Sequence, residues 1–112
     1  MKAPLMFDEP YRHPMIIRIV KMTFEPRHVE HFRSLFVGWA PRIRSFQGCT
    51  HLALLHDVND TRVFFTYSHW QDPADLEAYR NSDVFAGVWP VVKTLFTAPA
   101  EAWTVDLEQQ IP

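Results

Sequence analysis

The predicted strands carry apolar side chains on both of their faces, and this feature limits the folds open to the chain more than any other. Residues 15–24 (MIIRIVKMTF), 49–57 (CTHLALLHD) and 62–70 (RVFFTYSHW) are rich in β-branched, aromatic and aliphatic residues, which is typical of strands. Successive side chains of a strand point to opposite faces, so a sheet with one wet face shows alternating apolar and polar residues. In residues 15–24 both faces are apolar instead: Ile17 and Ile19 on one, and Ile16, Val20, Met22 and Phe24 on the other.

A first helix is predicted between the first two strands. Pro26 suits the first turn of a helix, where its missing N–H is not needed. The pair Gln47-Gly48 ends the segment. Apolar residues recur at three- and four-residue steps and form one helical face: Val29, Phe32, Phe36, Trp39 and Ile43.

A second helix is predicted to begin at Asp72-Pro73, with the aspartate as cap and the proline at the first helical position. Ser82-Asp83 forms a fresh cap, so this helix is expected to break near Asn81. Residues 101–107 (EAWTVDL) alternate between apolar and polar and are predicted to form the last strand.

The elements follow the β-α-β-β-α-β order of a ferredoxin-like α+β fold. Residues 58–61 (VNDT) have turn chemistry, so the strands on either side of them form a hairpin. We predict a four-stranded antiparallel sheet with both helices on one face, in a domain spanning residues 15–107. Residues 1–14 are rich in proline and lack periodicity, which predicts an N-terminal arm, and residues 108–112 are predicted to be a polar C-terminal tail.

Two helices cover only one face of this sheet, so the second apolar face needs another cover. An exposed apolar area of several hundred Å² is rare in a monomer. A two-fold partner that presents the same surface buries this area at low cost. The sequence therefore predicts a homodimer.

Composition and charge exclude several classes of protein. The chain of 112 residues has room for one domain, and 47% hydrophobic residues exclude a disordered chain. The formal charge of −2, without a basic patch, gives no reason to expect nucleic acid or an anionic membrane as a partner. Cys49 is the only cysteine, so no internal disulfide forms, and no apolar run reaches the ~20 residues that cross a bilayer. Asp8, Glu9 and the prolines near the start are unlike a secretion signal, and we expect a cytoplasmic protein.

Two stretches carry a resemblance to a known family: residues 69–85 (HWQDPADLEAYRNSDVF) and the run Phe46-x-Gly48-Cys49. Together with the strand order and the two-sided sheet, they resemble the antibiotic biosynthesis monooxygenase family over roughly residues 15–107. The resemblance implies a dimeric α+β barrel. It also implies a cofactor-independent monooxygenase that oxidises a small aromatic or quinol-like substrate, whose own carbanion reacts with O₂.

The chain departs from this family at informative positions. Tyr79 stands where many members have a histidine, three residues before Ser82. The haem-degrading branch has a tryptophan at that position and a haem-binding histidine ten residues later, where this chain has Trp89. That branch also uses an asparagine of the first strand, and residues 15–24 contain none. The resemblance therefore does not extend to haem degradation, and Tyr79 is a candidate for handling protons.

His51 and His69 are the other candidate catalytic residues. With the hairpin turn centred between Asn59 and Asp60, residue numbers paired across the two strands sum to about 119–120, which places the two imidazoles opposite each other or nearly so. Neighbouring imidazoles suit proton transfer or hydrogen bonding to a phenolic substrate. The alternative is that each is an ordinary histidine at a sheet or dimer surface.

Aromatic residues are the candidates for lining a substrate pocket between the helices and the sheet. Such a lining suits a small, flat, hydrophobic aromatic ligand. The alternative is that rings at helical spacing only fill the core. The candidate pocket residues are Phe36, Trp39, Tyr67, Trp70, Phe85 and Trp89.

Three functions remain open from the sequence. The first is the cofactor-independent monooxygenase, the second is a non-catalytic ligand-binding or structural dimer, and the third is another enzyme class on the same fold, such as an isomerase. No metal is predicted, because His28 and His31 lack a neighbouring cluster of other ligands. The resemblance implies that no cofactor is needed, and three glycines in the whole chain form no phosphate-binding loop for a nucleotide cofactor.

Overall fold

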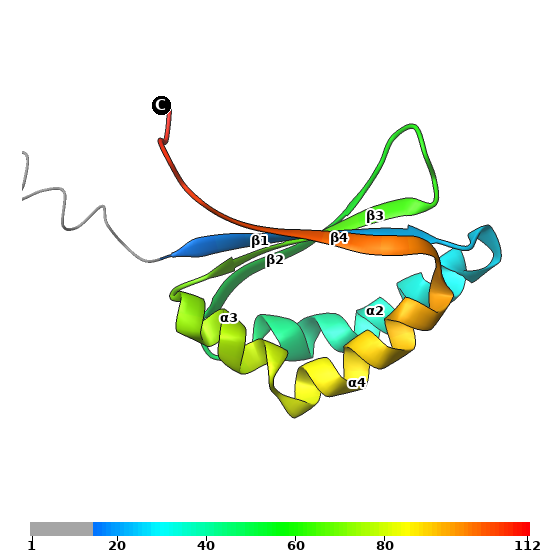
Figure 1. Ribbon diagram of the computed structural model, residues 1–112, viewed down its shortest axis with the longest axis horizontal. Coiled ribbons are helices and arrows are strands. Elements are labelled where there is room, and N and C mark those ends of the chain that lie inside the picture. The colour runs from blue at the N-terminus through cyan, green and yellow to red at the C-terminus, as the bar shows by residue number, and fades with distance from the viewer. Residues whose placement is uncertain (1–14) are drawn as a thin grey trace, which may run out of the picture.

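A four-stranded antiparallel sheet with helices on one side makes up the part of the chain that the computed structural model describes, residues 15–112 (Figure 1). The strands are β1 (Ile16–Phe24), β2 (Cys49–His56), β3 (Val63–Trp70) and β4 (Phe96–Asp106), in the order β2-β3-β1-β4 across the sheet. The helices are α2 (Val29–Arg44), α3 (Pro73–Arg80) and α4 (Asp83–Val92), with short 3₁₀ turns η1 (Pro26–His28) and η2 (Lys93–Leu95). The predicted ferredoxin-like α+β fold is confirmed. The predicted N-terminal arm lies outside the described residues.

Side-chain caps fix the starts of α3 and α4. Asp72 Oδ1 accepts a hydrogen bond from the Ala74 N–H at 2.8 Å, and Ser82 Oγ accepts one from the Phe85 N–H at 3.2 Å. Each cap satisfies a backbone donor that has no partner within its helix. The predicted helix break near Asn81 is confirmed, because Ser82 caps a separate helix. None of the helices in residues 15–112 is long and apolar enough to cross a membrane.

Strand β4 begins at Phe96, earlier than the predicted start at residue 101. The alternation of apolar and polar residues becomes regular only after Pro99, so the strand predicted from the sequence was too short at its start. β4 lies at the edge of the sheet, and its register with β1 shifts between Lys21 and Phe24. An edge strand with an irregular register accommodates a proline, since the missing N–H leaves no inner ladder bond unmade.

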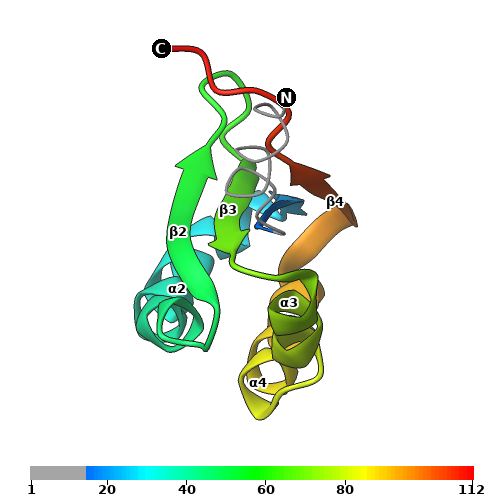
Figure 2. The same cartoon turned by 90° about the vertical axis from the view of Figure 1, so that its left-hand side faces the viewer.

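A cluster of phenylalanines anchors α2 against the sheet. Phe24 of β1, Phe32 of α2 and Phe64 of β3 are each at most 2% exposed. The ring centroids of Phe24 and Phe32 are 4.2 Å apart, and those of Phe24 and Phe64 are 5.7 Å apart. The helices of residues 15–112 all lie on this side of the sheet (Figure 2). Burial of three rings supplies a large share of the hydrophobic stabilisation of the fold, at roughly 1.5–3 kcal/mol for each.

The opposite face of the sheet, here called the open face, has no helix over it in the described residues (Figure 1). It is apolar nonetheless, and its Leu55 and Trp103 side chains are 45% and 44% exposed. The prediction of apolar residues on both faces is therefore confirmed, while the homodimer stays a prediction. The open face comprises Ile17, Ile19, His51, Ala53, Leu55, Phe65, Tyr67, His69, Trp103 and Val105, together with the charged pair Lys21 and Glu101.

Gly48 is a position where the backbone requires glycine. Its φ of 88° lies in the left-handed region, and a Cβ there would collide with the side chain of Asp75. We expect Gly48→Ala to lower the free energy of unfolding, measured by urea titration, by roughly 1–3 kcal/mol. Gly87→Ala is the control, since nothing lies within 4 Å of a Cβ at Gly87 and alanine should favour helix α4 by about 0.5–1 kcal/mol. Equal stabilities of Gly48→Ala and wild type would contradict this account.

Candidate active site

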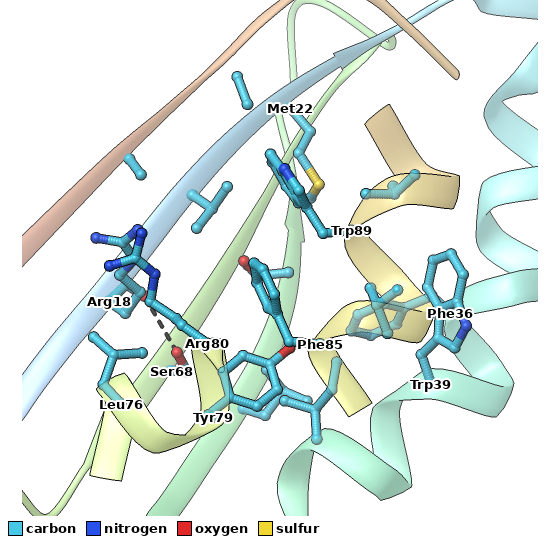
Figure 3. Close-up of a pocket in the computed structure, with 18 of the residues that line it drawn as sticks. Arg18, Met22, Phe36, Trp39, Ser68, Leu76, Tyr79, Arg80, Phe85 and Trp89 are labelled. Carbon is cyan, nitrogen blue, oxygen red and sulfur yellow. Dashed lines mark hydrogen bonds between the residues drawn. The ribbon is translucent and has the colours of Figure 1, made fainter. Parts of the chain in front are cut away.

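A cavity of about 310 Å³ lies between the helices and the side of the sheet that they cover (Figure 3). Alternate residues of the strands point into it, because a strand turns every second side chain to the same face. Its volume is at the lower end of the range for small-ligand sites. The lining consists of Arg18, Val20, Met22, Phe32, Phe36, Trp39, Ile43, Leu52, Thr66, Ser68, Trp70, Leu76, Tyr79, Arg80, Phe85, Val88, Trp89, Val92, Ala100 and Ala102.

Four aromatic rings form a continuous wall of the cavity. Trp70 stacks on Tyr79 with ring centroids 5.1 Å apart, and Tyr79 meets Phe85 edge to face at 5.3 Å. Phe85 in turn stacks on Trp89 at 6.0 Å. Contiguous rings of this kind offer a flat ligand both apolar area and stacking geometry.

Tyr79 brings a hydroxyl group to this wall. Its side chain is buried, and burial raises the pKa of the phenol to about 12, with a smaller contribution from Cys49. The phenol therefore keeps its proton at physiological pH. Tyr79 is suited to donate a hydrogen bond to a ligand oxygen and is unsuited to act as a base.

The indole of Trp70 is fixed by a short hydrogen-bond chain. Trp70 Nε1 donates to Ser68 Oγ at 3.0 Å, and Ser68 Oγ donates to the backbone carbonyl of Arg18 at 3.5 Å. Trp70 is 1% exposed, so an unpaired indole N–H would be costly there. The chain therefore holds the ring edge of Trp70 in one orientation beneath the cavity.

One end of the cavity is positively charged. Arg18 and Arg80 are the only charged residues in the described lining, which contains no histidine and no carboxylate. Arg18 Nη1 donates to Thr104 Oγ1 at 2.7 Å, while Arg80 Nη1 lies 3.7 Å from Glu77 Oε1 at the surface. Burial lowers the pKa of Arg18, and the nearby charge of Arg80 lowers it further.

Sequence reasoning did not single out these two arginines. Arg18 interrupts the apolar run of residues 15–24, and this charge within a buried strand was the available signal. Arg80 gave no such signal, because the last turn of a helix commonly carries a basic residue. Only the packing of α3 against the sheet brings Arg80 to the cavity.

Six of the nine predicted site residues line the cavity: Tyr79, Phe36, Trp39, Trp70, Phe85 and Trp89. The other three, His51, Tyr67 and His69, lie on the open face. Residues of odd number on β3 point away from the face that holds Trp70, which is why Tyr67 is absent from the cavity. The sheet separates both imidazoles from Tyr79, so the three candidate proton-handling residues do not meet in one site.

The two histidines of the open face are direct neighbours. His51 pairs with His69 across β2 and β3, as the predicted hairpin register requires, and their ring centroids are 4.8 Å apart. Nε2 of His69 is buried and finds no hydrogen-bond partner among residues 15–112. Burial lowers the pKa of His69, and the charge of His51 contributes to the lowering. Within the same residues, no three His, Cys, Asp or Glu side chains are grouped so that they could hold a metal ion.

The fold and cavity define a class of protein: a ferredoxin-like α+β domain with an aromatic-lined cavity between its sheet and its helices. The model of the antibiotic biosynthesis monooxygenase family matches residues 15–88. The chain therefore belongs to this family, which confirms the resemblance noted in its sequence.

Solved structures share the fold at low sequence identity. SnoaB, a cofactor-independent oxygenase from Streptomyces nogalater, is 16% identical with a TM-score of 0.79, over 88% of this chain and 98% of that one. Rv0793 from Mycobacterium tuberculosis is 15% identical with a TM-score of 0.79, over 88% and 99%. PA3566 from Pseudomonas aeruginosa is 21% identical with a TM-score of 0.75, over 86% and 96%. No curated protein matches the sequence.

The lowered pKa of His69 predicts a pH dependence of stability. Below the unfolded-state pKa of about 6.5, the imidazole of His69 binds a proton in the unfolded chain but stays neutral in the folded chain. The free energy of unfolding therefore decreases as the pH is lowered, until the pH reaches the folded-state pKa. We expect the melting temperature of wild type to fall more steeply between pH 7.5 and pH 5 than that of His69→Gln. His31→Gln, at an exposed position of α2, is the control and should retain the wild-type slope. Identical slopes for wild type and His69→Gln would count against a buried neutral imidazole.

Proposed function

We propose that this protein is a cofactor-independent monooxygenase that binds a small, flat aromatic or quinol-like substrate in the cavity. The observation that carries the proposal is an aromatic-lined cavity of about 310 Å³ in a member of the antibiotic biosynthesis monooxygenase family. SnoaB, which shares the fold, is a cofactor-independent oxygenase, and this supports the same class of reaction.

The chemistry asks little of the protein beyond binding and orientation. For an anthrone-like substrate, a CH₂ carbon loses two hydrogens and gains one oxygen atom of O₂, while the second oxygen atom leaves as water. The carbanion of the substrate supplies the electrons, so the protein has to favour ionisation and exclude water. Tyr79 would donate a hydrogen bond to the ionised substrate oxygen, and the ring wall would fix the plane of the substrate.

A second candidate function is ligand binding without turnover. The described lining of the cavity contains no histidine, aspartate or glutamate that could accept the substrate proton. An enzyme that deprotonates a weakly acidic carbon usually places such a base within reach of it. This lack favours either a substrate that ionises readily in water or a member of the family that only binds its ligand.

We further propose that the working unit is a homodimer formed through the open face. This face exposes Leu55, Trp103 and Val105 at more than two-fifths of their surface each, which is costly in water. A second copy related by a two-fold axis presents the same apolar surface and buries both.

Oxygen uptake with a panel of anthrones and hydroquinones tests the monooxygenase. We expect Tyr79→Phe to lower kcat/KM roughly tenfold to a hundredfold, because it removes a donor to the charged substrate oxygen. Tyr67→Phe deletes the same hydroxyl on the open face and should leave kcat/KM unchanged. Ligand binding without oxygen uptake across the panel would eliminate the enzyme and retain the second candidate.

Sedimentation at micromolar concentration tests the homodimer. We expect wild type to sediment as a dimer and Trp103→Glu as a monomer, because each copy would bury an unpaired carboxylate in the interface. Val37→Glu places the same charge at a 75% exposed position of α2 and should remain dimeric. A monomeric wild type would refute the interface.

A further inference from the structure

We propose that the cavity selects flat aromatic ligands that carry an ionised oxygen, a carboxylate or the oxygen of an acidic phenol or enol, and that Arg18 and Arg80 bind this anion. The inference rests on the cavity being the ligand site, as proposed above. It is a statement about binding and does not require that the ligand be oxidised.

The two arginines reach the same end of the cavity from different elements. Arg18 lies on β1 at a position that faces the helices, between Ile16 and Val20. Arg80 is the last residue of α3. The close-up shows both side chains extending to one end of the cavity, away from Trp39 and Phe36 at the other (Figure 3).

Arg18 lacks a counter-charge among the described residues, and Arg80 has only a weak one. Among residues 15–112, Arg18 forms no salt bridge, and its side-chain partner is the neutral hydroxyl of Thr104. Arg80 has only a long contact with Glu77 on the surface side. A half-buried guanidinium beside a second one is unfavourable, and the lowered pKa of Arg18 reflects both effects. An anion bound between them would remove this cost.

The chemistry of the pair fits an oxyanion on a ring. A guanidinium is planar and offers two parallel N–H donors, which matches a carboxylate and also serves a phenolate. The rest of the cavity is predominantly apolar and aromatic, so it would take the ring to which the anion is attached. A neutral quinol would leave Arg18 without a counter-charge and Arg80 with only its long contact to Glu77. Selectivity for the anion follows from this difference.

The absence of a base from the described lining agrees with the same assignment. A ligand that is already ionised in water needs no carboxylate or imidazole to remove its proton. Two nearby cations would lower the pKa of a bound phenol or enol further, because they stabilise its charged form. Tyr79 adds a neutral donor at the aromatic wall.

Binding of three matched probes tests the inference: 2-naphthoate, 2-naphthol and the neutral 2-naphthalenemethanol, each titrated at pH 7.5 by calorimetry. We expect 2-naphthoate to bind at least about tenfold more tightly than 2-naphthalenemethanol, as a charge-assisted hydrogen bond allows. The affinity for 2-naphthol should rise as the pH is raised toward the pKa of 2-naphthol, because more of the probe is then ionised. If only 2-naphthol shows this rise and 2-naphthoate does not bind, the recognised anion is a phenolate.

Variants locate the anion site. Arg80→Gln, at an exposed position, should weaken 2-naphthoate binding roughly tenfold and leave 2-naphthalenemethanol unchanged. Arg18→Gln should abolish the preference for the anion. Arg18→Lys keeps the positive charge but loses the two parallel N–H donors, and it should retain part of the preference. Arg27→Gln removes an exposed arginine of η1 outside the cavity and is the control. Circular dichroism melts of each variant establish that it folds.

The outcomes separate this inference from the proposed reaction. Equal affinity for the anionic and neutral probes, or 2-naphthoate binding that the Arg18 and Arg80 variants leave unchanged, would overturn the anion site. Oxygen uptake on neutral hydroquinones without a preference for anions would overturn it while keeping the monooxygenase. Anion-selective binding without oxygen uptake would keep the site and remove the reaction.

Discussion

The presence of apolar side chains on both faces of one sheet is the constraint on which the rest of this structure depends. The side that the helices cover is packed by Phe24, Phe32 and Phe64 at the first turn of α2. Further along the same side, Trp70 and Tyr79 hold α3 against β3 and leave the cavity between them and α4. The open face has the same apolar character without a cover in the described chain. One pattern in the strands thus accounts for the core, for the cavity and for the surface that would accept a second copy.

Much of the fold could be predicted because local chemistry decides it. Asp72 and Ser82 are helix caps whatever the tertiary structure, so α3 and α4 were expected as separate pieces. The turn between β2 and β3 fixes the register of the hairpin, and the register alone places His51 beside His69. The start of β4 was missed because Pro99 is compatible with a strand only at an edge, and strand order across a sheet is not a local property.

The site was predicted less completely, for a physical reason. Alternation along β3 shows that Tyr67 and Trp70 point to opposite faces, yet it does not show which face the helices cover. Assigning Tyr67, His51 and His69 to the same site as Trp70 therefore combined residues that the sheet separates. In the sequence, Arg18 resembles an ordinary arginine whose aliphatic stem is buried and whose charged end reaches water. Its significance depends on Arg80, and only the packing of α3 brings that residue to the same end of the cavity.

The described lining of the cavity offers donors and positive charge but no strong proton acceptor. Tyr79 keeps its proton, Arg18 and Arg80 are cations, and the indole N–H of Trp70 is already bonded to Ser68. Such a site can stabilise a negative charge on its ligand, whereas creating that charge falls to the ligand and to water. A substrate that reacts with O₂ through its own carbanion meets this requirement, and so does an aromatic acid that is only bound. The reaction and the binding role thus share one electrostatic basis, and the acidity of the ligand decides between them.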